Sequence, residues 1–184
     1  MRGYWLASLL LIAPRLEAQS PGPATGAEVR LEWIQTPAWR LELRDGGTIA
    51  RISSYGPGPV IGLTVGASLV RELQVFGSGQ WNGGGLGDGS GFTVAEIGIA
   101  GRLPTGSRFV PRVMATYGRF QETGGVRFSH WSAGAGADVY LSRVLSVGAD
   151  VRRVDPISAT SSRADSVTVM ARITRLHLGV ALHF

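Results

Sequence analysis

Apolar and polar residues alternate along most of this chain with a period of two. In residues 61–69 the odd positions are isoleucine, leucine, valine or alanine, and the even positions are glycine, threonine or serine. This period is typical of a β-strand with two unlike faces, because successive side chains point to opposite sides. The pattern recurs in 93–103, 109–117, 131–141 and 145–151. Helical periodicity is scarce, and 27 glycines among 184 residues disfavour helices. We therefore predict an all-β protein.

The first and last strand-like segments are less regular. Segment 29–43 has apolar residues at odd positions and charges at several even ones, with Pro37 between them. We interpret it as one strand with the proline at an edge or bulge, although a hairpin of 39–44 with 48–53 across the Asp-Gly-Gly at 45–47 is an alternative. Segment 167–184 changes phase near Thr174 and Arg175. We interpret it as a single strand with a bulge, and a tight turn is the alternative.

The connections between these segments are long and short in strict rotation. Those at 45–59, 83–90, 122–126 and 155–165 are the longer kind, rich in glycine, serine or proline, and those at 70–72, 104–107 and 142–144 are short. Eight strands joined by four long loops and three short turns fit this order, and transmembrane barrels have short turns on one side and long loops on the other. We therefore predict an eight-stranded antiparallel up-and-down transmembrane β-barrel, with both termini on the short-turn side.

The polar faces carry charges of both signs in nearly equal number. These are Arg30, Arg40, Arg102, Arg112, Arg152, Arg172, Glu32, Glu42, Glu96, Asp138 and Asp150. The interior of an eight-stranded barrel is just wide enough to be filled by side chains. We expect Glu96, Arg102, Arg112, Asp138, Asp150 and Arg152 to form ion pairs there while the apolar faces contact lipid. Trp81, Tyr117, Trp131, Phe109 and Phe184 lie near strand ends, as aromatic belts do.

The N-terminus indicates export. Met1 and Arg2 precede an apolar stretch over residues 4–13 and a small residue at Ala18. This arrangement is typical of a secretory signal peptide, and the apolar run is too short to span a bilayer as a helix. We expect residues 1–18 to be the signal peptide and residues 19–184 the barrel domain, placed in the outer membrane of a Gram-negative cell. No later segment is a candidate transmembrane helix.

The C-terminus resembles the β-signal of bacterial outer-membrane barrels. That pattern is a polar residue, a glycine, a hydrophobic residue and a terminal aromatic, and here His177, Gly179, Leu182 and Phe184 take those places. The resemblance implies recognition by the outer-membrane barrel assembly machinery. The rest of the mature chain is similar in architecture, rather than in specific motifs, to the small OmpA/OmpX-type eight-stranded barrels.

One pair of residues suggests chemistry. His130 and Ser132 share a strand face, and a His-x-Ser pair resembles that of the lipid A deacylase barrels, where a carboxylate completes the site. Glu122 is the nearest carboxylate in sequence, but the Ala-Gly at 133–134 departs from the asparagine-containing motif of that family. Polar filling of the interior is the simpler interpretation of the pair.

Other classes of site find little support. His177 and His183 are too far apart on a strand to form one metal-ligand pair, and the chain has no cysteine, so we predict no metal and no cofactor. The formal net charge of +5 does not indicate nucleic acid, because the arginines are scattered singly and lysine is absent. The glycine-rich 83–91 stretch lacks the lysine of a phosphate loop.

The sequence therefore favours a non-enzymatic, monomeric outer-membrane barrel with a structural or surface-interaction role, presenting four loops. We expect it to contact membrane lipid and lipopolysaccharide. Three alternatives remain: a lipid A-modifying enzyme that uses His130 and Ser132, a narrow porin-like passive pore, and a soluble lipocalin-like carrier whose apolar face points inward.

Overall fold

A computed structural model describes residues 25–45, 47–55, 58–82, 91–123, 125–161, 166–169 and 173–184. Strands account for nearly all of these residues, as the alternation of the sequence predicts. No helix in the described ranges is long and apolar enough to cross a membrane. The predicted signal peptide, residues 1–18, lies outside the described residues.

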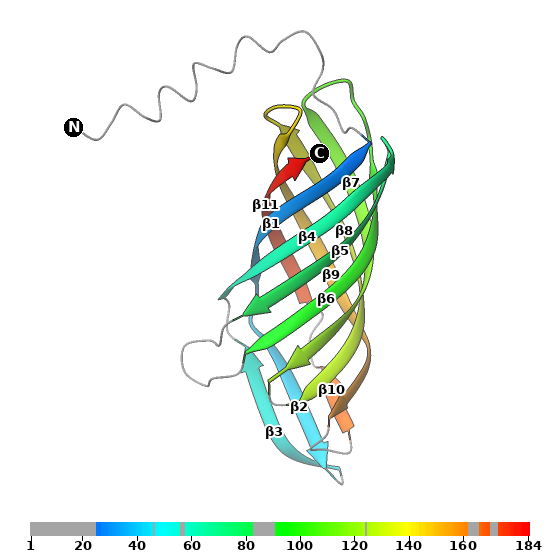
Figure 1. Ribbon diagram of the computed structural model, residues 1–184. Coiled ribbons are helices and arrows are strands. Elements are labelled where there is room, and N and C mark those ends of the chain that lie inside the picture. The colour runs from blue at the N-terminus through cyan, green and yellow to red at the C-terminus, as the bar shows by residue number, and fades with distance from the viewer. Residues whose placement is uncertain are drawn as a thin grey trace, which may run out of the picture.

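Eight antiparallel strands close into a barrel (Figure 1), which confirms the predicted fold class. The order around the barrel is β1-β11-β9-β8-β7-β6-β5-β4, and β1 closes it by pairing with both β4 and β11. The bounds are β1 (Gly26–Thr36), β4 (Gly58–Val70), β5 (Leu73–Asn82), β6 (Phe92–Arg102), β7 (Phe109–Glu122), β8 (Val126–Tyr140), β9 (Leu145–Ser161) and β11 (Ile173–His183).

A second, three-stranded sheet lies beyond one end of the barrel. It has the order β10-β2-β3, with β2 at Trp39–Asp45, β3 at Thr48–Tyr55 and β10 at Ser166–Val169. Figure 1 places this sheet at the end opposite to the start of β1 and the end of β11. The barrel wall thus continues into a smaller sheet at its long-loop end.

The small sheet corrects two sequence interpretations. Residues 29–43 are not one strand, because Pro37 and Ala38 separate β1 from β2, and the β2–β3 hairpin is the alternative that holds. Residues 167–184 are not one bulged strand either, because β10 pairs with β2 whereas β11 pairs with β9 and β1. The barrel still has eight strands, since β10 lies outside it.

The short connections lie at their predicted positions, but the predicted strict alternation of long and short connections does not hold. The turns between β4 and β5, β6 and β7, and β8 and β9 lie at the three predicted short positions. The predicted loop at 45–59 instead contains β3, and β9 continues to Ser161 through the first part of the predicted loop at 155–165. Only residues 123–125 separate β7 from β8, so that connection is also short.

Along most of the barrel the apolar side chains face outward and the charged side chains face inward. Leu63 is 41% exposed, whereas Glu96 is 4% exposed. The same contrast separates the outward Val147 and Val180 from the inward Arg112 and Asp150. A soluble barrel would show the opposite arrangement, because it buries its apolar face to remove it from water. The lipocalin-like alternative is therefore excluded.

Aromatic side chains lie on the exterior near both ends of the strands. Tyr117 and Trp131 are exposed neighbours on β7 and β8, with ring centroids 5.1 Å apart in an edge-to-face arrangement. Trp81 is exposed near the same long-loop end, and Phe109 and Phe184 are exposed at the short-turn end. This is the placement expected of the two aromatic belts of a transmembrane barrel.

Candidate functional site: the barrel interior

The part of the interior nearest to the start of β1 is filled by a network around Glu28. Arg30 Nε donates to Glu28 at 2.9 Å and its Nη1 donates to Asp138 at 2.9 Å. Arg102 donates to the same glutamate from β6, and Gln74 does so from β5 at 3.0 Å. All five side chains are buried. The Glu28 carboxylate therefore joins β1 to β5 and β6, and Arg30 links the same strand to β8.

The middle of the interior holds a second group of alternating charges. Arg112 Nη2 lies 2.5 Å from Asp150, and Arg152 Nε lies 2.6 Å from the other oxygen of that carboxylate. Arg152 on β9 also donates to Glu32 on β1 at 3.0 Å, over the intervening strand β11. A buried charge is costly unless it is paired, and each charge of this group lies against at least one opposite charge.

The third group surrounds Glu96 on β6. This carboxylate accepts hydrogen bonds from His130 Nε2 at 2.8 Å, Gln80 at 2.9 Å and Ser78 at 3.3 Å. Arg175, from β11, donates to the side-chain oxygen of Gln80 at 3.0 Å. The three groups together form one polar layer that runs along the interior.

The structure places all six sequence-predicted ion-pair residues in this layer. Their acidic members, Glu96, Asp138 and Asp150, each lie within 4 Å of an arginine or histidine nitrogen. Sequence reasoning missed Glu28 and Arg175. Glu28 continues the even-numbered polar face of its strand by one step, so the alternation could have found it, whereas Arg175 was obscured by the phase change beside it.

Two further charges on the predicted polar face lie elsewhere. Arg40 is exposed on β2, which belongs to the small sheet outside the barrel. Glu42 is buried on the same strand and accepts a hydrogen bond from Arg44 at 2.6 Å. Arg172 lies outside the described residues.

Glycines lie beneath the charged pairs. Glu96 and His130 are on β6 and β8, and the residue between them on β7 is Gly118. In the same way, Arg112 on β7 and Asp150 on β9 flank Gly136 on β8. A Cβ atom at Gly118 would lie 2.7 Å from atoms of both neighbours, which is closer than van der Waals contact. The glycines on the inner face thus make room for ion pairs that span three strands.

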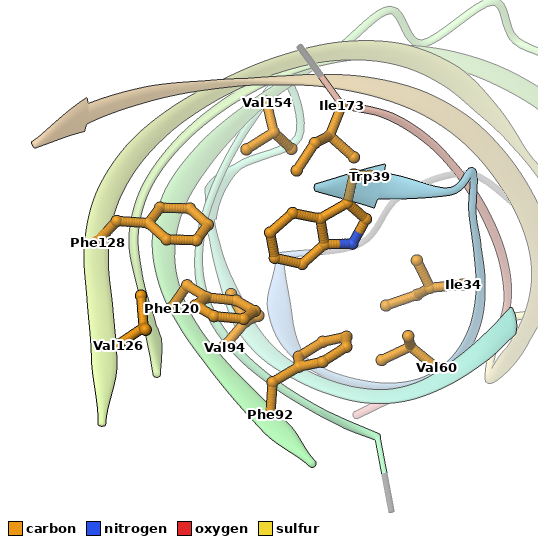
Figure 2. Packing of buried hydrophobic residues seen from close by; sticks show 10 residues of the cluster. All are labelled: Ile34, Trp39, Val60, Phe92, Val94, Phe120, Val126, Phe128, Val154 and Ile173. Carbon is orange, nitrogen blue, oxygen red and sulfur yellow. The ribbon is translucent and has the colours of Figure 1, made fainter. Parts of the chain in front are cut away.

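An apolar plug closes the interior at the long-loop end. Trp39 points into the barrel and is surrounded by aromatic and branched side chains (Figure 2). Its ring lies edge-on to Phe120 at 5.1 Å and to Phe128 at 6.1 Å. The other members are Ile34, Val60, Phe92, Val94, Val126, Val154 and Ile173. Trp39 is one of the apolar odd positions of segment 29–43, whose apolar face was predicted to contact lipid. That prediction is wrong for Trp39, because the break at Pro37 and Ala38 turns this side chain inward.

The polar layer leaves little open volume. The cavity found there holds about 10 Å³, and its lining includes Glu28, Arg30 and Arg152. That volume is about the minimum for one water molecule. The described side chains therefore fill the interior around Glu28 and Arg152, and the plug lies beyond them at the long-loop end.

His130 and Ser132 face the interior but are not hydrogen-bonded as a catalytic pair. His130 is fully buried and its Nε2 is held by Glu96 on β6. The Ser132 hydroxyl lies 2.5 Å from the hydroxyl of Thr116 on β7. Nucleophilic catalysis needs the base within hydrogen-bond reach of the serine and both groups open to substrate. In this geometry His130 is bonded to a carboxylate in the barrel interior, and Ser132 is hydrogen-bonded to a neighbouring threonine.

The four residues of the C-terminal pattern have two orientations. His177 faces the interior, with Nδ1 at 3.5 Å from Glu32. Gly179 pairs with Gly148 on β9 and with Glu32 on β1. Leu182 and Phe184 face outward. Among the described residues, no group of histidines and carboxylates has the arrangement of a metal site.

Comparison with solved structures gives the same fold. The chain is similar to Neisserial surface protein A (NspA), with a TM-score of 0.59 and 12% identity over 87% of this chain and 98% of that one. It is also similar to the outer-membrane protein OprG from Pseudomonas aeruginosa, with a TM-score of 0.60 and 14% identity over 90% and 99% of the two chains. The N-terminal barrel domain of Pseudomonas aeruginosa OprF gives 0.56 and 11%, over 88% and 100%. No family model and no curated protein sequence matches this chain. The shared feature is the fold of small eight-stranded outer-membrane barrels.

Proposed function

We propose that this chain is a monomeric, non-enzymatic protein of the outer membrane of a Gram-negative cell, which presents its β10-β2-β3 sheet at the cell surface. The observation that carries the proposal is the reversal of polarity, with apolar side chains outside the barrel and paired charges inside it. Such a surface is stable in hydrocarbon and costly in water. Export by residues 1–18 and recognition of the C-terminal pattern by the barrel assembly machinery belong to the same proposal.

The two functional alternatives fit the interior less well. A passive pore needs a continuous aqueous path, but the Trp39 plug and the charged layer occupy the lumen. A lipid A-modifying enzyme needs its nucleophile to reach a lipid substrate, but Ser132 and His130 are buried in the barrel interior. A surface role requires neither a path nor a pocket, and it uses the sheet that extends beyond the barrel.

Single-cysteine labelling on intact cells tests the proposal cleanly, because the natural chain has no cysteine. Thr48→Cys places a thiol at the exposed start of β3, at the long-loop end. Glu72→Cys is the matched control, exposed in the turn between β4 and β5 at the opposite end. We expect a membrane-impermeant maleimide to label position 48 in intact cells and position 72 only after permeabilisation.

The result has clear alternatives. Labelling of position 72 alone in intact cells would show that the barrel has the opposite orientation. Recovery of the protein in the soluble periplasmic fraction would exclude the membrane location. Unchanged lipid A mass spectra in cells that express wild-type protein or Ser132→Ala are expected as well. A modified lipid A that disappears with this substitution would establish the enzyme instead.

A further inference from the structure

Charged side chains are confined to one sector of the barrel exterior. Among the described outward-facing positions of the eight strands, the charged residues are Arg119 on β7, Arg127 on β8, and Arg153 and Asp155 on β9. All are in the long-loop halves of three adjacent strands. The described outward positions of β1, β4, β5, β6 and β11 carry no charge. This sector therefore differs from the rest of the lipid-facing surface.

Two of these arginines have no acidic partner among the described residues. Arg153 lies 3.3 Å from Asp155, so those two charges offset each other. Arg119 and Arg127 have no ion pair with any described residue. Arg119 pairs with Ser129, two residues from Arg127, so the two arginines are diagonal neighbours on one face. Cβ atoms in that relation lie about 7–8 Å apart, within reach of two long side chains that bind one ligand.

The polarity of β7 and β8 reverses at this level. Tyr117 and Trp131 face outward as part of the aromatic belt, but one step toward the loops the outward residue is Arg119 and the inward residue is Phe120. On β8, Arg127 faces outward and Phe128 inward. On the loop side of the Tyr117–Trp131 pair, the apolar side chains of these two strands therefore point into the plug instead of outward. The two arginines lie closer to the loops than the Tyr117–Trp131 pair, at the level where we expect lipid headgroups.

We propose that Arg119 and Arg127 bind the phosphate groups of a lipopolysaccharide-type glycolipid in the outer leaflet, with the Tyr117–Trp131 pair against its acyl and sugar region. Guanidinium groups present planar forks of N–H donors that match phosphate oxygens, and anionic headgroups are recognised by basic side chains beside the bilayer surface. This inference rests on the proposed membrane location and adds a specific lipid to it. The exposed aromatic pair supplies the apolar contact that a free phosphate ion would not need.

Lipid binding to the purified, detergent-solubilised protein tests the proposal by native mass spectrometry. The test variant is Arg119→Gln with Arg127→Gln, and the control is Arg108→Gln with Arg143→Gln, two exposed arginines in the short turns. Both variants remove two positive charges. The probes are lipid A with its phosphates, the same lipid A after phosphate removal, and phosphatidylglycerol. Heat-modifiable gel migration of each variant shows that the barrel is folded.

We expect the test variant to bind phosphorylated lipid A at least about tenfold more weakly than wild type, as the loss of charge-assisted hydrogen bonds predicts. The control is expected to bind like wild type, and lipid A without phosphates is expected to bind all variants weakly. Equal losses in both variants, equal binding of the dephosphorylated lipid, or equally tight binding of phosphatidylglycerol would overturn the inference. Those outcomes leave the cell-surface labelling unchanged, so failure here is distinct from failure of the membrane proposal.

Discussion

Glu96 on β6 and His130 on β8 are joined by a 2.8 Å hydrogen bond that passes over Gly118 on the strand between them. The intervening residue has no side chain, so the two groups meet above the backbone of β7. The Arg112–Asp150 pair over Gly136 repeats the arrangement one strand further round. The size of the neighbouring charged side chains therefore explains the glycines at positions such as Gly118 and Gly136 on the inner face.

Gly118→Ala is expected to destabilise the barrel. A Cβ atom there would lie 2.7 Å from Glu96 Cγ and 2.7 Å from His130 Nε2, and would push the bonded pair apart. Overpacking of this kind costs about 1–3 kcal/mol. Urea unfolding in lipid vesicles measures the change. Gly79→Ala is the control, because nothing lies within 4 Å of a Cβ at that position and little effect is expected. Equal stability of the two variants would contradict the account.

Glu96→Ala is expected to cost more, about 3–5 kcal/mol, because it leaves the His130, Gln80 and Ser78 side chains without their buried acceptor. Glu72→Ala, at an exposed turn, is expected to change the free energy of unfolding by less than about 0.5 kcal/mol. A double-mutant cycle with His130→Ala in the same vesicles measures the coupling of the pair. A coupling energy of zero would show that the hydrogen bond contributes nothing to stability.

Trp39→Ala is expected to destabilise the long-loop end by about 3–5 kcal/mol, since it empties the centre of a buried aromatic cluster. Tryptophan fluorescence and urea unfolding report the loss. Trp81→Ala removes an exposed ring from the exterior and creates no cavity, so a smaller cost is expected there. If both substitutions cost the same, Trp39 does not act as a packed plug.

Planar bilayer recordings are expected to show no steady conductance for the wild-type protein. The Trp39→Ala variant is expected to remain closed as well, because the charged layer fills the lumen independently of the plug. Stepwise, stable channel openings from either protein, at a protein level where a known porin gives them, would contradict a side-chain-filled interior.

The sequence predicts the membrane-embedded part of the fold better than the part beyond it. In the middle of the barrel, where Leu63 faces outward and Glu96 faces inward, the surroundings of the wall do not change along the strands. The alternation therefore identifies both faces correctly there. At the long-loop end the environment changes, and Phe120 faces inward beside the outward Arg119. Alternation distinguishes the two faces of a strand, but it does not show where along the strand the interior changes from polar to apolar. The sequence therefore did not predict the plug.

Two local breaks account for the other errors. Pro37 and Ala38 lead the chain out of the barrel and reverse the phase, so Trp39 turns inward. β10 belongs to the small sheet and β11 to the barrel. In the sequence this change of sheet produces only a change of phase, which is equally consistent with a bulge in one strand. The partners of each interior charge also depend on strands far apart in sequence, as Arg30 and Asp138 illustrate, and periodicity gives no information about those distances.

The central claim is that the oily side chains of the strands contact hydrocarbon. Spin labels on single cysteines at Leu63 and Val180 in lipid vesicles measure this directly through their collision rates with oxygen and with a water-soluble nickel chelate. Both residues face outward at mid-strand. We predict frequent collisions with oxygen and few with the chelate at both positions. The reverse result, with the chelate reaching both labels freely, would contradict the account.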